Sequence, residues 1–191
     1  KTLLRYPVVV WWTGYDWYAP VTTDEQASLA AYLNGGGRLI LSSQDFLYYH
    51  YDEPFTHDYL GVLTYTEDIT PTQLEGIWEN PVGAGLGPWA LDYPAGYRNW
   101  SDGVTPALDV GVAFREQGQL GAALTRRAGG GATAFFPLPL EALPSDARAT
   151  VIERAVGWLS WLGRSTFDVE PRSVELGDVV TYTLSLHNDG S

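Results

Sequence analysis

The sequence predicts an α/β fold built on a parallel β-sheet, and three segments near its beginning carry this prediction. Residues 6–13 (YPVVVWWT) form a continuous β-branched and aromatic run, typical of a strand buried on both faces. Residues 22–34 have the pattern of a capped helix, and residues 38–43 (RLILSS) form a second apolar run. Strand, helix and strand in this order indicate a right-handed βαβ unit and therefore parallel strands.

The helix of this unit has start and stop signals in the sequence. Thr22 followed by Glu25 matches a capping box, in which each side chain bonds to the backbone N–H of the other residue. Apolar side chains follow at helical spacing, and the three glycines at residues 35–37 end the helix.

The remaining elements are predicted from shorter patterns. We expect a short helix at 55–60, strands at 63–65, 73–78, 108–114, 121–125 and 132–137, and a helix at 145–162. Residues 45–51 are ambiguous, and residues 83–103 are rich in Gly, Pro and aromatic residues, which predicts an ordered loop. Ser145 is expected to cap the last helix, and its apolar stripe is predicted to be Ala149, Ile152, Val156, Leu159 and Leu162.

The character of the sequence changes after the last helix, which divides the chain into predicted domains at residues 1–164 and 165–191. From residue 166 onward, apolar and polar residues alternate between the turn signals Gly177-Asp178 and Asn188-Asp189-Gly190. This stretch has room for about two strands, too few for a stable sandwich. The sequence also lacks methionine. We therefore expect a piece of a larger multidomain protein, with a truncated second domain.

Composition excludes several classes of function. With 45% hydrophobic and 18% charged residues, the chain is expected to fold. Its net charge of −12 disfavours binding to nucleic acids and to anionic membranes, and no apolar run is long enough for membrane insertion. The absence of cysteine excludes disulfides, zinc–thiolate sites and thiol nucleophiles. No cofactor is predicted.

Three stretches together resemble a known family. Residues 8–14 (VVVWWTG), 22–46 (TTDEQASLAAYLNGGGRLILSSQDF) and 129–143 (GGGATAFFPLPLEAL), with the helix that follows, are similar to the class I glutamine amidotransferase-like fold. The resemblance covers residues 1–162. It implies a flavodoxin-like, three-layer α/β/α architecture with a parallel sheet, from which the family's first strand and helix are missing. The closest likeness is to amidotransferase-like domains appended to secreted bacterial proteins, including some extracellular peptidases.

The end of the chain resembles a second family. Val174, Gly177-Asp178, residues 180–183 (VTYT) and Asn188-Asp189-Gly190 are similar to the start of a conserved surface-protein repeat, an immunoglobulin-like β-sandwich. This resemblance implies a secreted or cell-surface location. It also implies that other domains of the same polypeptide are the first partners of the α/β domain.

The amidotransferase resemblance does not extend to the catalytic residues. Catalytic members place a cysteine on a sharp turn after a central strand and activate it with a histidine and an acid. The matching turn here, residues 42–46 (SSQDF), has no cysteine. The region near the end of the family's sheet supplies Glu141 but no histidine. Amidotransferase activity is therefore not expected.

A serine hydrolase is one alternative at the same turn. Ser43 would be the nucleophile, His50 or His57 the base, and Asp45 or Asp58 the orienting acid. Against this hypothesis, no G-x-S-x-G elbow surrounds the serine. The competing interpretation is that Ser42 and Ser43 only end a strand and bond to the turn backbone.

A metal site is another alternative. His50, Asp52, His57 and Asp58 lie within the segment HYDEPFTHD, and such side chains bind zinc or calcium. Pro54 interrupts any helix that would place the two histidines on one face. The competing interpretation is a solvated acidic loop.

The third candidate is a binding rim for a glycan or peptide. Its predicted ligand-binding residues follow the first two strands: Trp12, Tyr15, Trp17, Gln44, Asp45, Tyr48 and Tyr49. The carboxyl ends of parallel strands meet at one edge, aromatic faces stack on sugars, and polar side chains bond hydroxyls. Alternatively, these rings pack beneath residues 83–103, which contribute Trp89, Tyr93, Tyr97 and Trp100. The sequence thus predicts a non-catalytic accessory or recognition domain, with a hydrolase using a serine or metal site as the alternative.

Overall fold

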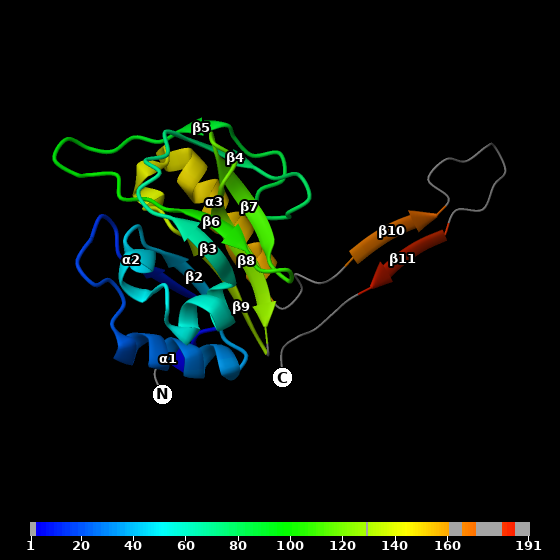
Figure 1. Cartoon of the computed structure of the whole chain (residues 1–191). Coiled ribbons are helices and arrows are strands. Elements are labelled where there is room, and N and C mark those ends of the chain that lie inside the picture. Colours follow the sequence, from blue (N-terminus) through cyan, green and yellow to red (C-terminus); the bar gives the residue numbers. More distant parts are fainter. Residues whose placement is uncertain (1–2, 129, 161–165, 171–180, 186–191) are drawn as a thin grey trace.

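The computed structural model describes residues 3–128, 130–160, 166–170 and 181–185 (Figure 1). Its helical segments are η1 (Leu3–Arg5), α1 (Thr23–Asn34), α2 (Phe46–His50), the π-helix η2 (Thr56–Leu60), η3 (Leu140–Ala142) and α3 (Ser145–Leu159). Its strands are β1 (Val9–Trp12), β2 (Arg38–Ser42), β3 (Val62–Thr66), β4 (Gln73–Gly76), β5 (Trp89–Ala90), β6 (Gly103–Pro106), β7 (Gly111–Glu116), β8 (Gly121–Ala128), β9 (Gly131–Phe136), β10 (Thr166–Glu170) and β11 (Thr181–Ser185).

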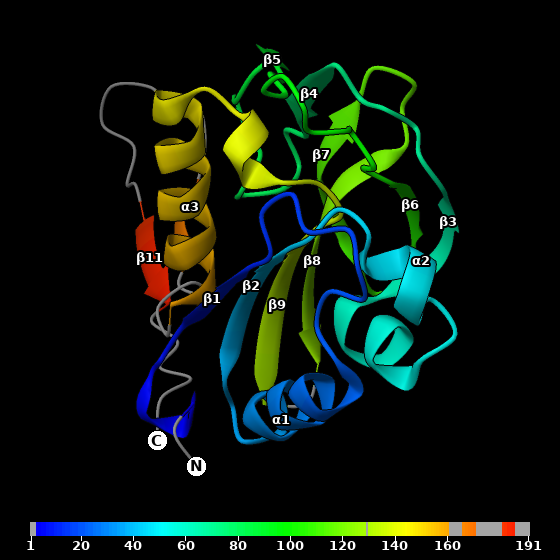
Figure 2. The ribbon, with the colours of Figure 1, turned by 90° about the vertical axis from the view of Figure 1, so that its left-hand side faces the viewer.

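The main sheet is mixed rather than parallel. Strands β1, β2 and β9 pair in parallel, whereas β9, β8, β7, β4 and β5 continue the sheet in antiparallel pairs. Strand β6 pairs antiparallel with both β8 and β3. The sheet curls strongly, like half a barrel (Figures 1 and 2).

The predicted flavodoxin-like, three-layer α/β/α parallel sheet is therefore wrong. Short connections explain the difference: only residues 117–120 separate β7 from β8, and only residues 129–130 separate β8 from β9. Connections this short join antiparallel strands, because a parallel crossover needs a dozen or more residues. The predicted βαβ unit is present as β1, α1 and β2, but it forms only one end of the sheet.

Alternate residues of β2 and β9 face two different cores. Leu39, Leu41 and Phe135 pack in one core with α1 and α2, and Ile40 and Phe136 pack in the other with α3. Figure 2 shows α3 on one side of these strands and α2 on the other. Because every residue of β2 and β9 is buried, these two strands have the continuous apolar character that the sequence displays.

The first predicted helix is confirmed, including its capping box. The Thr22 hydroxyl accepts from the backbone N–H of Glu25 at 3.4 Å, and the Glu25 carboxylate accepts from the backbone N–H of Thr22 at 2.8 Å. The short helix predicted at 55–60 corresponds to η2, which ends at Gly61 in the left-handed conformation, with φ of 76°.

Two predictions about burial are wrong. Strand β1 is at the edge of the sheet, so its residues alternate between half-buried and exposed instead of being buried on both faces. Helix α3 has its N-cap at Pro144 rather than at Ser145, and its buried residues are Ala147, Val151, Ala155 and Leu159. Of the predicted stripe, Leu159 is buried, Ile152 is half-buried, Ala149 and Val156 are exposed, and Leu162 lies outside the described residues. Two of the four buried residues are alanines, whose short side chains carry little weight in a hydrophobicity pattern.

The second predicted domain is described only in part. Strands β10 and β11 pair antiparallel with each other. The turn signals at residues 177–178 and 188–190 lie outside the described residues. The β-sandwich repeat and the domain boundary remain predictions.

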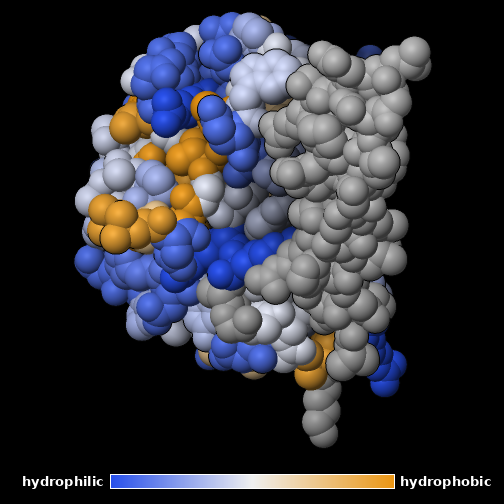
Figure 3. All heavy atoms as spheres, turned by 90° about the vertical axis from the view of Figure 1, so that its right-hand side faces the viewer, coloured by the Kyte–Doolittle hydropathy of each residue, from blue (hydrophilic) through white to orange (hydrophobic). Residues whose placement is uncertain are grey.

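One face of the molecule is largely hydrophilic where its residues are described. Figure 3 shows mostly hydrophilic residues, broken by small hydrophobic patches, on the part of that face that is not grey. Within the described residues, no helix combines the length and apolar character that crossing a membrane requires.

Candidate functional site

Three loops meet at the carboxyl ends of β1 and β2. One loop follows β1 (residues 13–22), one joins β2 to α2 (residues 43–45), and one runs from β5 to β6 (residues 91–102). In Figure 1 the first and third loops, drawn blue and green, project from the same side of the domain. Their side chains line two adjoining pockets.

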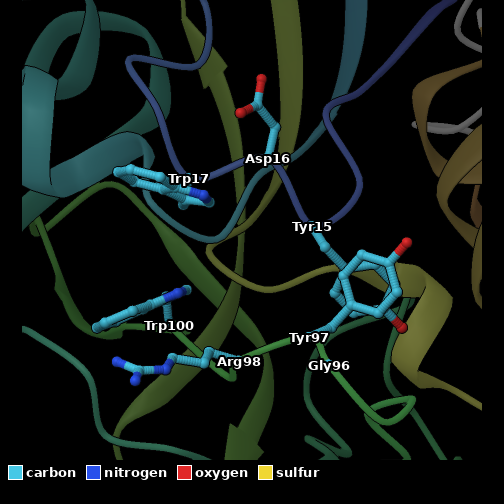
Figure 4. A pocket seen from close by; sticks show the side chains of 7 residues that line it. All are labelled: Tyr15, Asp16, Trp17, Gly96, Tyr97, Arg98 and Trp100. Carbon is cyan, nitrogen blue, oxygen red and sulfur yellow. The ribbon is translucent and has the colours of Figure 1, made fainter.

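The larger pocket has a volume of about 780 Å³ and is mainly aromatic. It is lined by Tyr15, Asp16, Trp17, Gly96, Tyr97, Arg98 and Trp100. Figure 4 shows the two tryptophans on one side and the two tyrosines on the other, with Asp16 and Arg98 at the edges. The Tyr15 and Tyr97 rings lie 4.5 Å apart, and the Arg98 guanidinium lies 5.3 Å from the centre of the Trp100 ring.

The smaller pocket adjoins the larger one and shares both tryptophans with it. Its volume is about 280 Å³, and it is lined by Trp17, Asp45, Tyr48, Tyr49, Glu67 and Trp100. The rings of Tyr48 and Tyr49 meet edge to face, with centres 5.0 Å apart and planes at 81°. The pocket therefore combines aromatic walls with two carboxyl groups.

The side chain of Gln44 links the loop at residues 13–22 to the loop at residues 91–102. Its side chain is fully buried, its amide nitrogen donates to the carbonyl oxygen of Tyr15 at 3.1 Å, and its amide oxygen accepts from the backbone N–H of Trp100 at 3.3 Å. The residue predicted as a ligand contact thus bonds to the protein itself, on both sides of the larger pocket.

A group of carboxyl side chains lies beside the smaller pocket. Asp45 is 8% exposed and Asp102 is 2% exposed, and each has a buried carboxyl oxygen without a hydrogen-bond partner. Burial, reinforced by the neighbouring acids Asp68 and Glu67, raises the pKa of Asp45 to about 7. Burial likewise raises the pKa of Asp102 to about 8, although a hydrogen bond from the backbone N–H of Asp68 opposes the shift.

The two serines of the predicted nucleophile turn are bonded within the fold. The Ser42 hydroxyl donates to the carbonyl oxygen of Leu138 at 2.9 Å and accepts from the backbone N–H of Leu140 at 3.1 Å. Ser43 is fully buried, and its hydroxyl oxygen accepts from the Thr13 hydroxyl at 2.9 Å. Both hydroxyls therefore bond to neighbouring segments, Ser42 to the backbone after β9 and Ser43 to the side chain of Thr13, rather than to the backbone of their own turn.

The two candidate histidines bond to other groups than Ser43. The His50 ring pairs with the Glu53 carboxylate at 3.1 Å, and the His57 ring bonds to the carbonyl oxygen of Val62 at 2.9 Å. The structure therefore does not bring Ser43, His50 and His57 together as a hydrogen-bonded set.

The candidate metal ligands are also dispersed. Asp52 and Asp58 are exposed. The Arg126 guanidinium donates hydrogen bonds to the backbone carbonyl oxygens of His57 and Asp58. Across the part of the chain that the structure describes, no group of three or more histidine, aspartate or glutamate side chains is arranged to hold a metal ion.

Most of the predicted rim lines the two pockets. Tyr15, Trp17, Asp45, Tyr48 and Tyr49 do so, whereas Trp12 is exposed outside them. The competing interpretation holds in part, because Tyr15 also packs against Tyr93 and Tyr97 of the covering loop.

The sequence analysis did not predict that acidic side chains surround Asp45. Glu67 and Asp68 follow β3, and Asp102 immediately precedes β6. They approach one another because β3 pairs with β6, a contact between segments about forty residues apart that no local pattern reveals.

Comparison with known proteins shows similarity of fold only. No protein-family model and no curated protein sequence matches the chain. A cytoplasmic protein from Salmonella typhimurium is similar in structure, with a TM-score of 0.54, 16% identity, and coverage of 83% of this chain and 73% of that one. A putative ThuA-like protein from Bacteroides uniformis ATCC 8492 gives a TM-score of 0.52 and 13% identity, with 83% and 71% covered.

A larger enzyme contains a similar fold. The β-galactosidase from Bacillus circulans sp. alkalophilus gives a TM-score of 0.57 and 10% identity over 88% of this chain, which spans only 26% of that protein. The ThuA-like neighbour supports an amidotransferase-like fold in its coarse outline. The identities are too low to transfer an activity.

Proposed function

We propose that this domain is a non-catalytic recognition module of a larger exported bacterial protein, and that it binds a glycan in the larger aromatic pocket. The observation that carries the proposal is the placement of Trp17 and Trp100, from two separate loops, along one side of a pocket of about 780 Å³. Exposed aromatic faces stack on the apolar faces of sugars, and the side chains of Asp16 and Arg98 offer an acceptor and donors for hydroxyl groups.

Two further observations support the proposal, one on the absence of catalysis and one on the larger protein. The position that holds the family's nucleophile is taken by Ser43, which is fully buried. In addition, a β-galactosidase carries a similar fold as about a quarter of its chain, so a domain of this kind is compatible with a larger carbohydrate-active protein. The exported location rests on the resemblance of the tail to a surface-protein repeat.

The test is binding of oligosaccharides to the wild-type chain and to the variants Trp17→Ala and Trp100→Ala. A glycan array would find the ligand, and titration calorimetry would measure its affinity. Each variant should lower the affinity at least about tenfold, roughly 1.4 kcal/mol, because a central aromatic contact is lost. Trp78→Ala is the matched control, since Trp78 is 77% exposed and lines neither pocket. Equal losses in all three variants, or binding lost only when the protein unfolds, would contradict the proposal.

A hydrolase at the same rim is the second candidate, and Asp45 is the observation that favours it. A buried carboxyl group with a raised pKa beside a pocket is typical of catalytic acids. Turnover of ester, amide or glycoside substrates by the wild type, and its loss in Asp45→Asn without a lower melting temperature, would reverse the ranking of the two functions.

A further inference from the structure

We infer that the smaller pocket binds an organic ammonium ion, either a protonated amine or a quaternary ammonium group. The inference goes beyond glycan binding and does not depend on it: the two pockets share Trp17 and Trp100, but the residues that decide cation binding, Asp45 and Tyr48, line only the smaller one. It rests on the chemistry of the pocket walls, on an unpaired carboxyl group and on the size of the pocket.

The walls of the smaller pocket are of the kind that attract cations. Four of its six lining side chains are aromatic, namely Trp17, Tyr48, Tyr49 and Trp100, and the other two are the carboxyl groups of Asp45 and Glu67. Aromatic ring faces carry negative electrostatic potential and bind alkylammonium groups, most strongly when several rings surround the ion. No lysine, arginine or histidine lines this pocket to compete for the site.

The carboxyl group of Asp45 lacks the partner that its burial demands. More than nine-tenths of the residue is buried, its Oδ2 atom has no hydrogen-bond partner, and the charged groups that act on it are Asp68, Glu67 and Asp16, all acidic. A buried carboxylate is costly unless it is paired or hydrogen-bonded. A cationic ligand would supply this missing charge.

The neighbouring pocket contains an internal example of the same interaction. The Arg98 guanidinium lies over the Trp100 ring at 5.3 Å from its centre, so Trp100 already contacts a cation of the protein itself. Arg98 lines the larger pocket and not the smaller one, and the cation–π contacts of the described residues leave the rings of Trp17, Tyr48 and Tyr49 to an external cation.

The size and the ligand set favour an organic cation over a metal ion. A volume of about 280 Å³ is just below the usual range for a whole small ligand, but it admits an alkylammonium head group. Metal ions require several oxygen ligands that converge on one point. Such a convergence of three or more acidic or imidazole side chains is absent from the described residues.

The experiment compares choline with its neutral isostere 3,3-dimethylbutan-1-ol, in buffer of constant ionic strength at pH 8. Tryptophan fluorescence and chemical-shift perturbation report binding, and butylammonium serves as the protonated-amine probe. Choline or butylammonium should bind at least tenfold more tightly than the alcohol. The preferred cation identifies the class: butylammonium if hydrogen bonding to Asp45 dominates, choline if the aromatic rings dominate.

Two variants test the residues that carry the inference. Asp45→Asn keeps the shape of the side chain but removes its charge. Tyr48→Leu keeps an apolar side chain but removes the aromatic ring. Each variant should weaken cation binding at least tenfold. Glu79→Gln, an exposed acid outside both pockets, is the charge-matched control and should change the affinity less than twofold. Circular dichroism verifies that each variant is folded.

Three outcomes would overturn the inference: equal affinity for the alcohol and the cations, no effect of Asp45→Asn in a folded protein, or equal competition by potassium ions. Failure of cation binding would leave the glycan proposal intact, because that proposal is tested with neutral sugars and Trp17 and Trp100 variants.

Discussion

Asp45 and Asp102 are buried carboxyl groups, and the charged side chains that act on them are acidic. The charged groups that act on Asp45 are Asp68, Glu67 and Asp16, and those that act on Asp102 are Asp45, Asp68 and Glu67. Burial is the larger cause of the raised pKa values, and these acids add to it, so both favour the protonated form. The pKa values rise from an ordinary 3.8 to about 7 for Asp45 and about 8 for Asp102.

These shifts predict that the folded state loses stability as the pH rises. Between about pH 4 and pH 7–8 the folded protein holds protons on Asp45 and Asp102 that the unfolded chain has released. The free energy of unfolding should therefore fall with increasing pH across this window, by up to about 1.4 kcal/mol per pH unit for each group. Above the folded pKa values the contribution becomes constant. Urea denaturation at several pH values from 5.5 to 8.5 measures the slope.

Asparagine variants isolate the two groups in that measurement. Asp45→Asn and Asp102→Asn should each flatten the pH dependence and raise the free energy of unfolding at pH 8.5, where the wild type holds buried charges. An unchanged slope in both variants would show that other groups cause the dependence.

At the scale of elements, the two pocket loops depend on Gln44. It bonds to Tyr15 in one loop and to Trp100 in the other, so the separation of the pocket walls is fixed through one buried amide. Gln44→Met keeps the volume but removes two partly buried hydrogen bonds, to the carbonyl oxygen of Tyr15 and from the N–H of Trp100. We expect a loss of about 1–3 kcal/mol in the free energy of unfolding, together with weaker ligand binding.

Limited proteolysis of the Gln44 variant tests the role of the loops directly. Cleavage within residues 91–100 should become faster than in the wild type, because that loop loses one of its attachments. If stability falls while the cleavage rate and the affinity stay unchanged, Gln44 stabilises the core without positioning the loops.

Elements with local signals were predictable from the sequence, and those fixed by long-range pairing were not. The capping box at Thr22 and the buried strand β2 depend on neighbouring residues, and both are confirmed. The pairing of β3 with β6 depends on contacts between segments about forty residues apart, whereas the antiparallel direction of β8 follows from its short connections to β7 and β9. For the same reason, the aromatic rim was predicted from residues that follow β1 and β2, whereas Glu67 and Asp102 were missed.

At the scale of the whole molecule, the net charge of −12 bears on which ligands approach the rim. Net negative charge attracts cations over distances comparable with the Debye length, which is about 10 Å at 0.1 M salt and about 3 Å at 1 M. A neutral sugar experiences no such attraction. The two proposed ligands should therefore respond differently to salt.

Salt titration separates the two pockets without any mutation. Raising sodium chloride from about 20 mM to about 500 mM should weaken choline binding roughly fivefold or more, because the acidic groups around Asp45 become screened. Binding of a neutral oligosaccharide in the larger pocket should change less than about twofold, since stacking and hydroxyl contacts involve no net charge on the ligand. Titration calorimetry at four salt concentrations measures both affinities. Choline binding that is independent of salt would show that the charge of Asp45 takes no part in recognition, and would overturn the inference of a cation site built on that carboxyl group.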